Sequence, residues 1–168
     1  MNLVETIDLC LRLTQRRAEE GDIKLVKTVP SDRVMLIADP RACKQILLNL
    51  LSNAVKFTRR SGTVEIIATA GSESVSLKVR DTGIGIPADL LPRLGNAFEQ
   101  GSNDPMLARE GTGLGLALVK AFAEMHGGEA AMQSTLGEGT TVRVRLPYGA
   151  VNADGLRVDP IEELRGAA

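Results

Sequence analysis

Residues 46–57 read ILLNLLSNAVKF, an apolar run that carries three polar side chains at fixed spacing. Asn49, Asn53 and Lys56 stand at positions i, i+4 and i+7, and a helix with about 100° per residue places all three on one narrow stripe. Apolar side chains occupy the opposite side. The run therefore predicts a helix that is buried along one side and presents an ordered polar stripe along the other.

Helix and strand patterns alternate along the rest of the chain. Asp39 and Pro40 mark the start of this helix, because Asp caps free amides and Pro loses no hydrogen bond at the first helical position. Further helices are expected over 3–20 and over 112–126, the second stopped by glycines at 127–128. Strand patterns cover 23–29, 33–38, 63–70, 74–81, 129–135 and 140–146, the first two joined by a turn at 30–32. The order indicates an α/β (α+β) two-layer sandwich, a mixed β-sheet covered on one face by helices.

The composition excludes several function classes. The chain has 168 residues and a formal net charge of −1 with both signs interspersed, so we expect no nucleic-acid partner. Cys10 and Cys43 lack the spacing of a zinc site or a redox motif and are expected to be reduced core thiols. No apolar stretch approaches the ~20 residues of a membrane span, and the first residues do not resemble a signal peptide. We expect a cytoplasmic domain, although a longer parent protein can still carry a membrane anchor.

Three glycine-bearing segments interrupt these elements. DTGIGI (81–86) follows a strand, GTGLGL (111–116) precedes a helix, and GEGT (137–140) precedes a strand. Glycines let a ligand approach the backbone, and the free amides and dipole at the start of helix 112–126 favour a phosphate chain. Taken alone, each segment fits a plain turn equally well.

Asp81 closes the strand that precedes the first glycine segment. Its carboxylate can accept a hydrogen bond from an amine such as the exocyclic N6 of adenine. It can equally accept one from the backbone of the turn that follows. Spacing and composition do not choose between these two roles.

Taken together, the segments resemble a known family. Its features here are Asn49-x-x-x-Asn53 with Lys56-Phe57, then DTGIGI, Phe98-Glu99-Gln100, GTGLGL and GEGT, which resemble in this order the N, G1, F, G2 and G3 boxes of sensor histidine kinases. The resemblance covers about residues 1–147 and implies the catalytic ATP-binding domain of a two-component kinase. That domain has the Bergerat fold of the gyrase, heat-shock-chaperone and mismatch-repair ATPases. Leu94-Gly95, together with GTGLGLALVKAF and HGG, is further similar to the alphaproteobacterial PleC/DivJ-like cell-cycle kinases.

The resemblance also assigns roles to individual residues. It implies that Asn53 binds Mg²⁺ between the ATP phosphates, with Asn49 assisting from one turn away, and oxygen ligands suit this metal. Lys56 would reach a phosphate oxygen, Phe57 would pack near the adenine, and Asp81 would recognise it. The remaining nucleotide contacts are expected from Gly83, Gly85, Ile86, Phe98, Gly111, Thr112, Gly113, Leu114, Gly115, Leu116 and Thr140. ATP and Mg²⁺ are thus the expected cofactors, and residues 87–110 are expected to form a mobile ATP lid.

Asn49 indicates phosphoryl transfer rather than hydrolysis. In the related ATPases the corresponding residue is a glutamate that activates water, whereas an amide is no general base near neutral pH. The resemblance implies that the γ-phosphoryl group passes to a histidine on a two-helix dimerisation segment, with Asn49 and Lys56 acting through positioning and charge. The only histidine here, His126, stands at a helix end and is expected to cap it. The expected partners are that segment of the parent protein and, through it, a response-regulator receiver domain; we expect the isolated domain to be monomeric.

Two other functions stay open. The sequence LGNAF (94–98) departs from the Ile-Phe-Glu-Pro-Phe of many family members, which would suit a non-catalytic module that binds nucleotide or a regulator. The other alternative is an ATPase or a serine kinase of the anti-sigma-factor type. Intact Asn53 and Asp81 argue against the first alternative, and Asn49 argues against hydrolysis.

The chain after Pro147 lies beyond the resemblance. We therefore expect a catalytic domain at 1–148 and a C-terminal tail at 149–168. Glycine-containing NADG (152–155) marks an exit from the sheet. Asp159-Pro160 repeats the capping signal, so residues 161–165 predict one or two helical turns.

Overall fold

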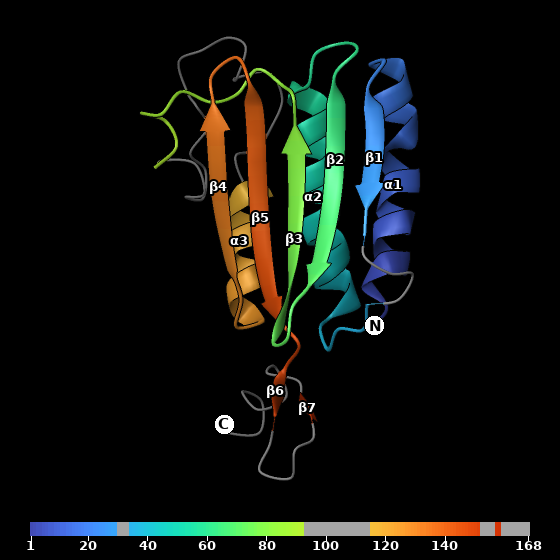
Figure 1. Cartoon of the computed structure of the whole chain (residues 1–168), viewed down its shortest axis with the longest axis vertical. Coiled ribbons are helices and arrows are strands. Elements are labelled where there is room, and N and C mark those ends of the chain that lie inside the picture. The colour runs from blue at the N-terminus through green and yellow to red at the C-terminus, as the bar shows by residue number, and fades with distance from the viewer. Residues whose placement is uncertain (30–33, 93–114, 152–156, 159–168) are drawn as a thin grey trace.

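The computed structural model describes residues 1–29, 34–92, 115–151 and 157–158, which build a helical layer on a β-sheet (Figure 1). The sheet contains, in spatial order, β1 (Lys24–Thr28), β2 (Thr63–Ala70), β3 (Ser74–Asp81), β5 (Gly139–Pro147) and β4 (Glu129–Thr135). β1 pairs in parallel with β2, and the other neighbours are antiparallel. One face of the sheet is covered by α1 (Leu3–Glu20), α2 (Pro40–Phe57) and α3 (Gly115–Met125). The expected two-layer sandwich with a mixed sheet is confirmed.

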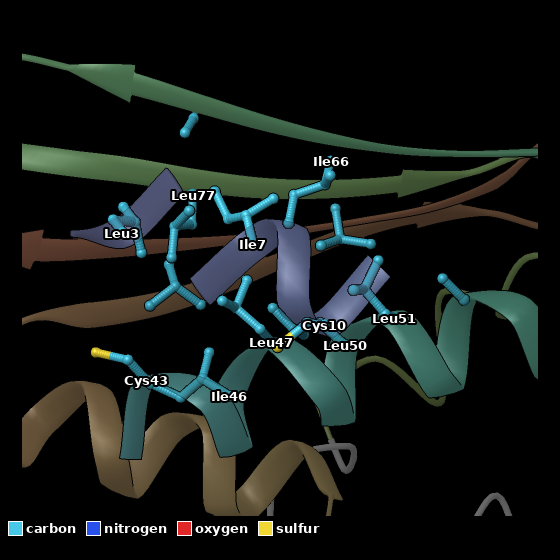
Figure 2. Close-up of a cluster of buried hydrophobic side chains, with 14 of the residues drawn as sticks. Leu3, Ile7, Cys10, Cys43, Ile46, Leu47, Leu50, Leu51, Ile66 and Leu77 are labelled. Atoms are coloured by element: carbon cyan, nitrogen blue, oxygen red, sulfur yellow. The ribbon is translucent and has the colours of Figure 1, made fainter. Parts of the chain in front are cut away.

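The hydrophobic core lies between the two layers (Figure 2). Every second residue of β2 and β3 is buried, as at Ile66 and Leu77, because successive strand side chains point to opposite faces. Cys10 and Cys43 are free thiols within this core. Burial raises the pKa of both thiols to about 11, which keeps them protonated at neutral pH. This agrees with the reduced core cysteines expected from the sequence.

The second helix forms as its sequence predicts. Asp39 caps α2 by accepting the Arg41 backbone N–H at 2.8 Å, and Pro40 occupies the first turn. The helix ends at Phe57, after which Thr58 donates its backbone N–H to the Ala54 carbonyl at 3.1 Å. Its buried side consists of Ala42, Cys43, Ile46, Leu47, Leu50, Leu51, Ala54 and Val55. The polar stripe is left half-buried along the helix edge.

The prediction of a strand over 33–38 is wrong. Residues 34–36 make only an isolated antiparallel bridge, Met35 with Asn2, and do not join the sheet. Leu3 donates its N–H to the Val34 carbonyl at 2.8 Å, and Leu36 donates its N–H to the Met1 carbonyl at 3.0 Å. The alternation of buried Val34 and Leu36 with exposed Met35 is present as expected. The partner of this segment is the short stretch before α1, which is too short to build a strand.

The last helix and strands also match their patterns. α3 ends at Met125, and Gly127 then takes a positive φ of 66°, which confirms the expected glycine stop. The expected helix start at 112–114 and most of the expected loop at 82–111 lie outside the described residues; the part at 82–92 is irregular. Two short strands, β6 (Ala150–Val151) and β7 (Arg157–Val158), pair beyond the end of β5 (Figure 1). Residues 159–165, with the expected tail helix, lie outside the described residues.

Among the helices in the described part of the chain, none is long and apolar enough to cross a bilayer.

Candidate functional site

Asp81 stands at the end of β3 with its carboxylate buried. Its Oδ1 accepts two backbone hydrogen bonds, from the N–H of Gly83 at 2.8 Å and from the N–H of Thr140 at 3.2 Å. Within the part of the chain that the structure describes, Oδ2 takes no hydrogen bond. Burial raises the pKa of Asp81 above its usual 3.8, although the two backbone bonds oppose the rise. Oδ1 thus fixes the orientation of the carboxylate, and Oδ2 stays available as a hydrogen-bond acceptor.

The turn after Asp81 is packed against the end of α2. A side chain on Gly83 would collide with the carbonyl of Phe57, and Ile84 donates its N–H to that same carbonyl at 3.1 Å. Thr82 ties the turn to the neighbouring strand, because its hydroxyl accepts the N–H of Thr63 at 2.9 Å. Glycine at 83 is therefore required by close approach rather than by backbone conformation.

The β4–β5 hairpin closes over the same turn. Gly137 donates its N–H to the Ile84 carbonyl at 2.7 Å. Gly85 has a positive φ of 67°, and a side chain there would collide with the carbonyl of Thr135. The DTGIGI and GEGT segments are far apart in sequence but thus form one surface. This surface lies at the end of the sheet where β3 and α2 also end (Figure 1).

Ser134 of β4 holds this surface together, and the sequence analysis missed it. Its hydroxyl accepts the N–H of Ile86 at 2.8 Å and lies 2.8 Å from the hydroxyl of Thr140. It also donates to the carbonyl of Gly139 at 2.9 Å. The only sequence signal was a hydroxyl residue in a strand next to the GEGT segment, which is too common to single out.

The polar stripe of α2 faces the start of α3. Asn49 donates from Nδ2 to the carbonyl of Gly115 at 3.5 Å, and its Oδ1 accepts from Gln45 Nε2 at 3.1 Å. The Nδ2 of Asn53 lies 3.4 Å from where a Cβ on Gly115 would stand. The last turn of α2 completes the stripe, with Lys56 Nζ 5.0 Å from the centroid of the Phe57 ring.

The donor set of this stripe fits Mg²⁺ better than a transition metal. The described residues hold no cluster of three or more His, Cys, Asp or Glu side chains that would form a cage. Asn53 is half-buried, and its single amide oxygen suits a magnesium ion whose other ligands are mostly water and phosphate oxygens.

The structure therefore gathers many of the predicted site residues and leaves others untested. Asp81, Gly83, Ile86 and Thr140 lie in one hydrogen-bonded group that includes Ser134, and Gly85 lies close against Thr135 in the same turn. Asn49 and Asn53 lie beside Gly115. Leu116 follows Gly115 in α3 and is half-buried against the core. The expected lid spans 87–110, and its residues 93–110 lie outside the described residues. The same holds for the predicted site residues Phe98, Gly111, Thr112, Gly113 and Leu114.

His126 is buried at the far end of α3 and is 3% exposed. Its Nδ1 lies 2.7 Å from the carbonyl of Phe122, and its Nε2 accepts the backbone N–H of Asp39 at 3.1 Å. These contacts confirm the expected helix-capping role and add a link to α2 that the sequence did not predict.

Comparison with known proteins agrees with this arrangement. The family described as "Histidine kinase-, DNA gyrase B-, and HSP90-like ATPase" matches residues 38–150. Histidine protein kinase DivJ of Caulobacter vibrioides is 46% identical over 143 residues, which cover 85% of this chain and 24% of that protein. This confirms the likeness to DivJ-like kinases, and this chain spans about a quarter of DivJ.

Solved structures show the same fold. The catalytic domain of histidine kinase ThkA superimposes with a TM-score of 0.78 at 24% identity, covering 88% of this chain and 95% of that one. Full-length ShkA in complex with AMPPNP gives a TM-score of 0.76 at 32% identity, covering 88% of this chain and 30% of that one. The chain therefore belongs to the histidine kinase-, DNA gyrase B-, and HSP90-like ATPase family, on the branch of the histidine kinase catalytic domains.

Proposed function

We propose that this chain binds Mg-ATP and transfers its γ-phosphoryl group to a histidine on a dimerisation segment, as one step of two-component signalling. The observation that carries the proposal is the Asp81 carboxylate, oriented through Oδ1 by two backbone amides with Oδ2 left for a ligand. The similarity to DivJ and to ShkA, solved with AMPPNP, supports the same conclusion.

Adenine recognition follows from the chemistry of Asp81. A buried carboxylate oxygen is a strong acceptor, and the exocyclic amine of adenine is the matching donor. Guanine presents a carbonyl oxygen at the corresponding position, so the same group would repel it. Phe57 is half-buried beside the turn and is proposed to pack against the base. The glycines of this turn keep the surface free of side chains that would block the ring.

The phosphate chain is proposed to lie between the α2 stripe and the start of α3. Asn53, assisted by Asn49, would hold Mg²⁺, and Lys56 would contact a phosphate oxygen. The metal, when bound, would neutralise charge on the phosphates. Further contacts are proposed from the glycine segments and their neighbours, namely Gly83, Gly85, Ile86, Gly115, Leu116 and Thr140, together with Phe98, Gly111, Thr112, Gly113 and Leu114 of the part not described.

Phosphoryl transfer is favoured over hydrolysis by the residue at position 49. Its amide is occupied by Gln45 and Gly115 and supplies no base to activate water. His126 is an unsuitable acceptor, because it is buried and both ring nitrogens are engaged. The accepting histidine is therefore proposed to lie on another segment of the parent protein, which would pass the phosphoryl group to a receiver domain in the cytoplasm.

A transfer assay tests this function. The chain is mixed with γ-labelled ATP, Mg²⁺ and the histidine-bearing dimerisation segment of the parent protein. We expect acid-labile label on that segment, none on the chain, and release of free phosphate much slower than transfer. Labelling of His126, or phosphate release as fast as transfer, would contradict the proposal.

A further inference from the structure

His126 fixes the start of α2 from the end of α3. As the capping residue of α2, Asp39 uses its side chain to accept from Arg41 and its carbonyl to accept the Cys43 N–H at 3.0 Å. Its remaining backbone group, the N–H, donates to His126 Nε2 at 3.1 Å. Because Nε2 accepts this proton, the ring proton lies on Nδ1, where it reaches the Phe122 carbonyl at 2.7 Å. The His126 ring, in one defined tautomer, therefore links the end of α3 to the start of α2.

The two helices are antiparallel, so His126 acts at the opposite end from the candidate phosphate site. The start of α2 meets the end of α3 at Asp39 and His126, and farther along α2 Asn49 meets the start of α3 at Gly115. The relative register of the helices along their axes therefore sets how far Gly115 lies from Asn49.

The fully buried apolar side chains of α3 define this register only weakly. Of the described residues of α3, only Val119 and Ala123 are fully buried, and both are small; the larger Leu116 and Phe122 pack against the core only partly buried. Small side chains form a smooth seam on which a helix can shift along its axis, whereas directed hydrogen bonds cannot tolerate such a shift. At the Gly115 end the Asn49 contact is long, at 3.5 Å. The shorter bond, which is partly buried, is the one from the Asp39 N–H to His126 Nε2, at 3.1 Å.

We propose that His126 is a positioning residue for the kinase reaction. It holds α3 in the register that places the start of that helix against Asn49 and Asn53, and so sets the spacing of the triphosphate and metal site. It touches neither nucleotide nor metal. The inference rests on the proposed function, because it concerns the same nucleotide site.

Two substitutions separate the two hydrogen bonds of His126, the one to the Asp39 N–H and the one to the Phe122 carbonyl. In His126→Gln the side-chain oxygen reaches the former Nε2 position and can still accept the Asp39 N–H. In His126→Asn the amide mimics Nδ1, so the cap to Phe122 is kept and the link to α2 is lost. Val119→Ala is the matched control, because it loosens α3 by loss of apolar packing and leaves His126 intact.

The readout is the ratio of Mg-AMPPNP affinity to AMP affinity, measured by competition against a fluorescent adenine nucleotide on this chain below its unfolding temperature. AMP reports the Asp81 side of the site, which α3 does not build. We expect His126→Asn to lower the ratio by about 3- to 10-fold, the effect of one hydrogen bond. We expect His126→Gln to restore most of it, and Val119→Ala to lower the melting temperature without changing the ratio.

An unchanged ratio in folded His126→Asn would overturn the positioning role, as would an equal loss in Val119→Ala. If His126→Asn does not fold, folded His126→Gln decides. An affinity ratio near the wild-type value supports the role. A ratio as low as the one that wild type gives for AMPPNP and AMP without Mg²⁺ refutes it. Failure of the proposed function would look different, since the wild-type chain would then bind neither AMP nor Mg-AMPPNP.

Discussion

The carboxylate of Asp81 contributes to the fold through one oxygen and to the proposed function through the other. Oδ1 accepts the backbone N–H groups of Gly83 and Thr140, and without it both groups would lose this hydrogen-bond acceptor. Burial raises the pKa of Asp81, so holding it ionised at neutral pH lowers the stability of the empty domain. A bound adenine amine would offset this cost. Such a conflict between local stability and function is typical of binding sites.

Asn53 allows a test of the metal site at the same scale. Asn53→Ala should weaken Mg-ATP binding more than binding of metal-free ATP, because Asn53 is proposed to reach the nucleotide only through Mg²⁺. Titration calorimetry with excess Mg²⁺ and with a chelator measures both affinities. Gln45→Ala is a suitable control, since Gln45 is exposed and contacts the stripe only through Asn49. An equal loss with and without metal in Asn53→Ala would argue against the role.

At the scale of elements, the turn after β3 and the β4–β5 hairpin depend on each other. Gly85→Ala should destabilise the chain by more than the ~1–2 kcal/mol of a strained left-handed residue, because its Cβ would collide with the Thr135 carbonyl. It should also reduce nucleotide binding by separating the two segments.

Gly137→Ala is the matched control for this substitution. Gly137 also has a positive φ, 84°, but a Cβ there would meet nothing within 4 Å among the residues that the structure describes. It should therefore cost only the conformational strain, measured by urea unfolding, and leave nucleotide affinity near wild type. Equal destabilisation by both substitutions would mean that the contact between turn and hairpin is loose.

Local patterns predicted most elements, and the failures are non-local. α2 could be read from the Asp39-Pro40 start and the apolar spacing, and β2 and β3 from their alternation. The 34–36 segment has the same alternation yet pairs with residues 1–3, because a strand pattern does not name its partner. The roles of Ser134 and the Asp39–His126 link depend on residues distant in sequence. Motif resemblance supplied the site residues, which no single segment identified.

At the scale of the whole molecule, the domain is proposed to end at Tyr148. The backbone N–H of Tyr148 donates to the Glu73 carbonyl at 3.0 Å, and Tyr148 packs against the core. β6 and β7 then lie beyond one end of the sheet, and β3, whose last residue is Asp81, ends at the opposite end (Figure 1). Deleting residues 150–168 should leave ADP affinity within about twofold. Extending the deletion to residue 148 provides the contrast and should lower the melting temperature. A large loss of binding with the shorter deletion would place the tail within the functional domain.

Binding of ADP by wild type and Asp81→Asn tests the central claim, an adenine site built on Asp81. The amide can keep the two backbone bonds but then turns its NH₂ group toward the adenine amine, so both partners are donors. We predict an intact fold, at least as stable as wild type, and a loss in affinity of about 10- to 150-fold. Wild-type affinity should fall as the pH drops through the raised pKa of Asp81, because the ionised carboxylate is a stronger acceptor than the protonated acid, and Asp81→Asn should lack this dependence. Calorimetry at neutral and mildly acidic pH measures both effects. Unchanged ADP affinity in folded Asp81→Asn would contradict the account and reduce Asp81 to a turn-forming residue.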